Sequence, residues 1–117
     1  MPQTLKTATL VFLGGALGSG FRFLLGLQLD TFWYLFAANL LGALLLGFVS
    51  GRAWAHWVQP FFGTGVAGGF TTMSGVSLLI NAHLVPNPIT TCLEIVTMVA
   101  AGLAAYSLGK FIARGVR

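Results

Sequence analysis

The chain has 117 residues, of which 56% are hydrophobic and only 7% are charged, and its mean hydropathy is +0.89. A soluble domain of this size carries about a quarter charged residues, so this chain has too few charges to cover a globular surface. The composition excludes a soluble protein and predicts an all-α integral membrane protein. A membrane-crossing helix needs about 20 apolar residues, so we expect four crossings, short loops and no further domain.

Four apolar runs follow one another along the chain. The first begins near Lys6 and is too long for the apolar part of a signal peptide, so it is interpreted as a membrane helix. Pro86, Asn87 and Pro88 separate the third run from the fourth. The predicted single four-helix domain has transmembrane helices at about 5–27, 32–53, 61–82 and 89–113.

The middle of the third helix has an unusual composition. Residues 63–77 contain five glycines and several hydroxyl side chains at membrane depth. Glycine permits non-helical backbone, and Thr71, Thr72 and Ser74 can bond to the backbone groups that a break frees. Such backbone is tolerated in a membrane only where it is buried in protein or lines a water-filled cavity. The pattern predicts a break, and a tightly packed kink without a ligand is an equal alternative.

Polar residues inside the apolar runs are further candidates. Asn39 lies in the second helix, where its amide suits either a small anion or an interhelical hydrogen bond. Arg22 lies about 25 Å along the first helix at 1.5 Å per residue, which predicts a structural or vestibule role near the outer interface. Cys92 is interpreted as a packing residue, and the roles of Glu94 and Tyr106 stay open.

Small residues recur at every fourth position and predict close helix packing, and with it an oligomer. The faces are Gly14 and Gly18 on the first helix, Ala43, Gly47 and Gly51 on the second, and Ala101, Ala105 and Gly109 on the fourth.

Basic residues are distributed unequally between the two sides of the membrane. Four crossings place both termini and the loop after the second helix on one side. That side carries Lys6, Arg52, Lys110, Arg114 and Arg117, and the loops near Asp30 and His83 carry no lysine or arginine. The positive-inside rule therefore predicts cytoplasmic termini and a single orientation.

Three blocks resemble the CrcB/Fluc family of fluoride channels over nearly the whole chain. They are residues 14–23, 37–43 and 65–74. The resemblance implies an antiparallel dimer in the bacterial plasma membrane with two pores that let fluoride leave the cytoplasm passively. It implies that Asn39 and Ser74 belong to the fluoride path. It also implies a structural sodium ion at the dimer interface, held by the backbone carbonyls of Gly68 and Thr71.

The chain departs from the family pattern at two pore positions. Met73 and Val76 stand where the family has phenylalanines whose ring edges face fluoride, and Leu79 stands where a glutamate is often found. An antiparallel homodimer also requires a dual topology, in which one sequence inserts both ways, and the charge asymmetry opposes this. Both observations predict that the partner is a homologous but different subunit of opposite orientation.

Two alternatives belong to other classes of protein. A small multidrug transporter also has four helices, but it needs a buried carboxylate in the first helix, where this chain has Arg22. A non-conducting assembly subunit remains compatible with the altered pore positions. The sequence shows no catalytic constellation, no metal-ligand spacing and no feature of nucleic-acid binding, so we do not expect an enzyme.

Overall fold

The computed structural model describes residues 2–115, and this part of the chain is helical without any strand. Three helices are long and apolar enough to cross a membrane: α1 (Gln3–Gly26), α2 (Thr31–Ser50) and α5 (Pro88–Gly115). A further segment is divided into a π-helix η1 (Gln59–Ala67), a single turn α3 (Gly68–Phe70) and α4 (Met73–His83). The predicted all-α membrane fold is confirmed, with its break in the third segment.

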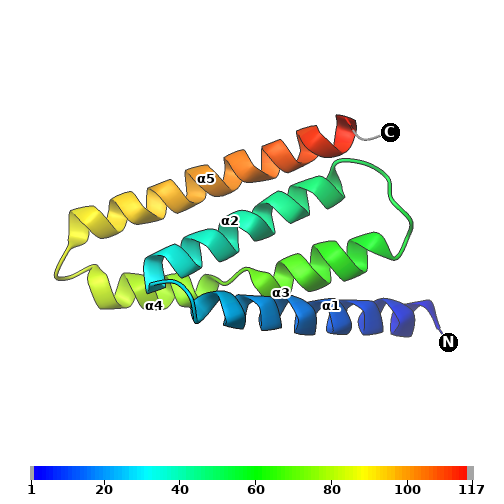
Figure 1. The fold of residues 1–117 in the computed structure, drawn as a ribbon, viewed down its shortest axis with the longest axis horizontal. Coiled ribbons are helices and arrows are strands. Elements are labelled where there is room, and N and C mark those ends of the chain that lie inside the picture. Colours follow the sequence, from blue (N-terminus) through cyan, green and yellow to red (C-terminus); the bar gives the residue numbers. More distant parts are fainter. Residues whose placement is uncertain (1, 116–117) are drawn as a thin grey trace.

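The segments run antiparallel to their neighbours along the chain (Figure 1). The start of α1, the connection between α2 and η1, and the end of α5 lie at one end of the molecule. The connections from α1 to α2 and from α4 to α5 lie at the other end. The segments that carry Lys6, Arg52, Lys110 and Arg114 are therefore together at one end, and Arg117 lies outside the described residues.

Small residues bring two pairs of helices into backbone contact, α2 with α5 and α1 with η1. A Cβ atom added to Gly47 on α2 would collide with the carbonyl of Tyr106 on α5. A Cβ atom at Gly14 on α1 would likewise collide with the carbonyl of Phe61 on η1. The small faces of α1 and α5, and Gly47 and Gly51 of α2, thus serve packing within the chain, as apolar helices in lipid require.

Large apolar side chains cover the outside rather than the interior. Phe12 on α1 is 73% exposed and Phe111 on α5 is 76% exposed, whereas the buried core is small and includes Leu35 and Leu79. Lipid tails are as apolar as leucine, so an outward apolar surface has no cost in a bilayer. The free energy of packing therefore comes from close backbone approach and polar contacts at the break.

The helix ends lie within three residues of the sequence-based bounds, and two of the differences have a local reason. The second helix ends at Ser50 rather than near residue 53, and Trp54 then folds back so that its Nε1 donates to the Phe48 carbonyl at 3.4 Å. The third segment begins at Gln59, two residues earlier than expected, with Pro60 in its first turn. Proline suits a first turn because the amide hydrogen it lacks would have no helical partner there.

Candidate functional site: the break in the third segment

The break consists of two extended residues between α3 and α4. Thr71 has φ −77° and ψ 155°, and Thr72 has φ −146° and ψ 118°. The Thr71 amide and hydroxyl both donate to the Ala67 carbonyl at 3.0 Å. The Thr72 hydroxyl accepts from the Gly75 amide at 3.0 Å and so caps α4. Hydroxyl groups therefore satisfy part of the backbone that the break frees.

Side chains of α1 bond to the backbone on one side of the break. The Ser19 hydroxyl donates to the Gly69 carbonyl at 3.3 Å. One turn later, Arg22 Nη1 donates to the Thr71 carbonyl at 3.0 Å. A hydrogen bond from a guanidinium is stronger than one between neutral groups. Arg22, near the end of α1, thus reaches the break through its guanidinium, while its place near the outer interface stays a prediction.

Asn39 of α2 bonds to the other extended residue. Its Oδ1 accepts from the Thr72 amide at 2.8 Å, and its Nδ2 donates to the Thr72 carbonyl at 3.3 Å. These two bonds therefore take the place of the backbone hydrogen bonds that Thr72 would make in a helix or a strand. An amide nitrogen carries two hydrogens, so one donor of Asn39 is left over from this pair of bonds.

A groove of about 380 Å³ lies beside Asn39 between α2, the break, α4 and α5. The lining residues are Asn39, Thr71, Thr72, Met73, Val76, Ser77 and Ile80, with Ile95, Met98 and Val99 from α5. The structure thus brings together three of the four predicted path residues, and Ser74 is outside this lining. The Ser74 hydroxyl instead shares a hydrogen bond of 3.2 Å with that of Thr72.

Two side chains at the break escaped the sequence analysis. Ser77 lines the groove, and its hydroxyl donates to the Met73 carbonyl one turn earlier, at 3.0 Å. Its spacing of four residues from Met73 is a signal that both share one helix face. Ser19 had no comparable signal, because its bond to Gly69 depends on how α1 packs against the third segment.

A second groove, of about 370 Å³, lies on the side of α2 that faces η1 and α3. It is lined by Gly42, Ala43, Leu46, Gly63, Thr64, Ala67, Gly68 and Thr71. Most of these residues are small, so the backbone of the third segment is accessible from this groove. Gly68 is exposed there, and no atom lies within 4 Å of the place where its Cβ atom would stand.

The two carbonyls expected to hold sodium differ in their surroundings. Between residues 2 and 115, no three His, Cys, Asp or Glu side chains gather where they could hold a metal, so backbone oxygens are the available ligands. The Gly68 carbonyl has no hydrogen-bond partner in the described part of the chain. The Thr71 carbonyl already accepts from Arg22. A cation on its other lone pair would lie about 5 Å from the guanidinium, a repulsion of about 3 kcal/mol at an effective dielectric constant near 20. The Gly68 carbonyl therefore fits the ion and the Thr71 carbonyl fits it poorly.

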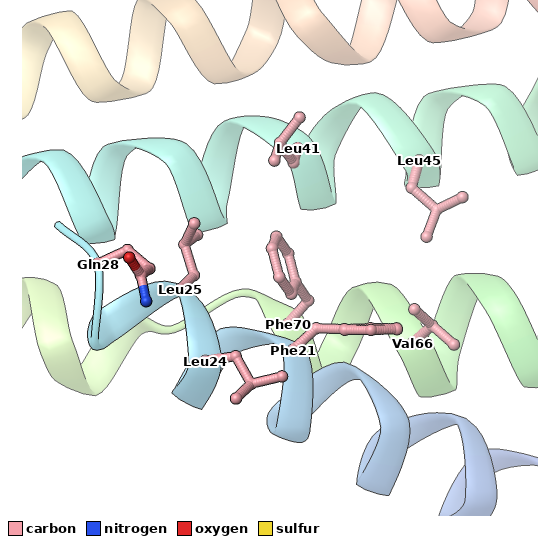
Figure 2. A pocket seen from close by; sticks show the side chains of 8 residues that line it. All are labelled: Phe21, Leu24, Leu25, Gln28, Leu41, Leu45, Val66 and Phe70. Atoms are coloured by element: carbon pink, nitrogen blue, oxygen red, sulfur yellow. The ribbon is translucent and has the colours of Figure 1, made fainter.

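A further groove is apolar and lies between α1, α2 and the third segment (Figure 2). It has a volume of about 520 Å³ and is lined by Phe21, Leu24, Leu25, Gln28, Leu41, Leu45, Val66 and Phe70. Gln28 is its only polar side chain, and Phe70 points into the space between the two helices. An anion path needs hydrogen-bond donors along its wall, so this groove is a poor candidate for ion passage.

Comparisons with known proteins agree with the geometry of a membrane channel. A family model described as CrcB-like protein, Camphor Resistance (CrcB), matches residues 9–110. The fluoride-specific ion channel FluC 2 of Halalkalibacterium halodurans is 32% identical, over 97% of this chain and 90% of that protein. FluC 2 of Rhodococcus jostii is 38% identical, over 88% and 95% respectively. FluC 1 of the same Rhodococcus jostii strain is 37% identical, over 86% and 80%. These relatives are named as channels and not as enzymes.

Proposed function

The chain belongs to the CrcB family, and on this premise we propose that it is a subunit of a passive, fluoride-specific channel that lowers fluoride in the cytoplasm. The names of its relatives support fluoride as the permeating ion. Because these relatives are named as fluoride channels, the proposal of a fluoride channel is preferred over the alternative of a small multidrug transporter. The observation that carries the proposal is the placement of Asn39, bonded to the break and facing a groove at membrane depth.

The chemistry of the groove suits a small anion. Asn39 has a donor beyond its bond to the Thr72 carbonyl. Ser77 lines the same groove, but its one hydroxyl hydrogen bonds to the Met73 carbonyl and would have to turn away from it to reach an anion. Fluoride is strongly hydrated, so a path for it must replace water with donors. Selectivity in such paths depends on the donors that line them and on the width of the constriction. Asn39, Met73 and Val76 of one subunit supply only one wall, and the partner supplies the other.

The direction of transport follows from the chemistry of the ion. Fluoride enters cells as a neutral weak acid and dissociates in the less acidic cytoplasm. A passive anion path then allows the membrane potential, negative inside, to drive the anion out. No coupling to protons or nucleotides is needed.

The proposal includes a structural sodium ion, for which only one of the two expected carbonyls is a good ligand. The free Gly68 carbonyl at the small-residue groove can donate one ligand to a hard cation, which prefers oxygen. Because of Arg22, the Thr71 carbonyl is the weaker ligand of the pair. A structural ion at the subunit interface would then depend mainly on Gly68 and on the partner, so we do not expect it in the purified chain without that partner.

Two observations favour an unlike partner of opposite orientation. Five basic residues lie on the side of the termini and none lies in the two opposite loops, which favours one orientation with cytoplasmic termini. Met73 and Val76 lack the aromatic edges that the family uses at these positions. The presence of FluC 1 and FluC 2 in one strain of Rhodococcus jostii is consistent with paired subunits.

The proposal is tested by fluoride efflux from liposomes that contain this chain together with a homologous chain from the same genome. We expect fluoride efflux without chloride efflux, and a large loss of rate in Asn39→Ala of this chain. Asn81→Ala is the control, because Asn81 is exposed on α4 and makes no hydrogen bond through its side chain among the described residues. A non-conducting assembly subunit predicts the same rate for Asn39→Ala as for the control.

A further inference from the structure

Among the described residues, Arg22 is the one lysine or arginine that does not lie at the end of the molecule with the termini; it stands near the end of α1, four residues before Gly26. The other five, Lys6, Arg52, Lys110, Arg114 and Arg117, are at the end of the molecule that carries the termini or in the flanking residues. Arg22 is half-buried on α1 and directs its guanidinium to the break in the third segment. A charged group inside a membrane protein is costly unless it is paired, and here its partner is a backbone carbonyl.

That carbonyl lies where negative partial charge gathers. The helix formed by η1 and α3 ends at Phe70, so the carbonyls of its last turn point toward the break. The C-terminal end of a helix carries a negative partial charge and favours a cation beside it. Ser19 bonds to the Gly69 carbonyl in this last turn and Arg22 bonds to the Thr71 carbonyl just beyond it, so one face of α1 covers both carbonyls.

The same oxygen is one that a bound metal ion would use. Thr71 lines both grooves of the break, the small-residue groove with Gly68 and the groove with Asn39. A guanidinium fixed on its carbonyl supplies positive charge at this point permanently. A free cation on the same oxygen would be repelled by it.

We propose that Arg22 is a built-in cation of the break, which holds the Thr71 carbonyl and keeps the break in shape without a sodium ion on that oxygen. Arg22 is then a positioning residue: it acts through the backbone of Thr71 on the orientation of Thr72 and Asn39. This inference rests on the geometry of the break and not on fluoride conduction, so a failure of the efflux experiment leaves it unaffected.

The test is thermal unfolding of the purified chain in detergent, in sodium chloride and in N-methylglucamine chloride at equal ionic strength. We expect the wild-type Tm to be the same in both salts. Arg22→Gln should lower the Tm by several degrees in N-methylglucamine and regain part of this loss in sodium, because the Thr71 carbonyl becomes open to the small cation. Lys6→Gln removes the same charge from an exposed position of α1 and should change neither value.

Each outcome decides the proposal. A residue with a merely structural role would lower the Tm equally in both salts when replaced, and that result would overturn the inference. A wild-type Tm that rises clearly in sodium would overturn it as well, and this measurement needs no variant. If Arg22→Gln does not fold, Arg22→Lys keeps the charge and should remain insensitive to sodium. Amide hydrogen exchange adds a local readout: exchange at Thr72 should be faster in Arg22→Gln by on the order of tenfold in N-methylglucamine.

Discussion

Asn39 and Thr72 are joined by two hydrogen bonds, one to the amide and one to the carbonyl of the same residue, at 2.8 and 3.3 Å. Thr72 is buried and extended, and it lies between two helices of the third segment. A buried backbone group without a partner costs about 1–3 kcal/mol, so the amide of Asn39 stabilises the break and also limits its shape. The residue that faces the candidate ion path is thus also a structural support of that path.

The first prediction follows from this double role of Asn39. Asn39→Ala removes both bonds to Thr72 and should lower the free energy of unfolding by about 1–3 kcal/mol. Thermal or denaturant unfolding in detergent measures the change. Asn81→Ala, at an exposed site of α4, should stay within about 0.5 kcal/mol of the wild type. Equal stability of the two variants would contradict the hydrogen bonds to Thr72.

The second prediction concerns the contact between α2 and α5. Gly109→Ala should destabilise the fold by about 1–3 kcal/mol, because its Cβ atom would collide with the Leu44 carbonyl and the Phe48 amide nitrogen. Gly102 lies on the same helix with no atom within 4 Å of its Cβ position. Gly102→Ala should therefore be neutral or stabilising by about 0.4–1 kcal/mol. Unfolding of both variants measures this, and an equal loss in both would contradict the close packing at Gly109.

The third prediction concerns the two altered path positions. Met73 is 77% exposed, so Met73→Phe should fold without loss of stability, whereas Val76 is 9% exposed and Val76→Phe should cost about 1–3 kcal/mol from overpacking. If the missing aromatic edges weaken one of two unequal pores, Met73→Phe should raise fluoride efflux of the paired subunits. Met73→Leu is the matched control, since it replaces the side chain by another large apolar one without an aromatic edge. An equal rate in both variants would show that the edge has no role there.

The fourth prediction concerns orientation. A reporter at the C-terminus that fluoresces only in the cytoplasm should be active, and one that needs export should be inactive. Replacement of Lys110 and Arg114 by glutamine, with two lysines placed beside Asp30, should produce a mixed orientation. Lys110 is held near the Tyr106 ring, at 5.7 Å from its centroid, so the replacement also removes a modest cation–π contact. A mixed signal from the wild type would contradict the single orientation.

The break could be predicted because its cause is local. Glycines and hydroxyl residues between 63 and 77 weaken the helix and can bond to the freed backbone, and Thr71 and Thr72 do so in the structure. The small faces of α1 and α5, Gly14 and Gly109 among them, also follow from spacing along one helix. These features depend on neighbours in sequence.

The contacts of Arg22 could not be predicted in the same way. Its bond to Thr71 depends on how α1 is aligned along the third segment, and no spacing in the sequence specifies that alignment. Helix length alone predicts that Arg22 lies near the outer interface, and this stays a prediction; helix length does not specify the backbone group to which Arg22 bonds. The pairing of Asn39 with Thr72, 33 residues away, depends on tertiary packing in the same way.

The most direct test of the central claim, a channel completed by an unlike subunit, is fluoride efflux from liposomes with one or both chains. The account predicts little or no efflux with this chain alone and rapid, fluoride-specific efflux when the homologous chain of opposite orientation is added. The matched measurement in the presence of the partner uses Asn39→Ala of this chain, which should reduce the rate. Rapid efflux with this chain alone would contradict the account, since it would show that two copies of one sequence suffice.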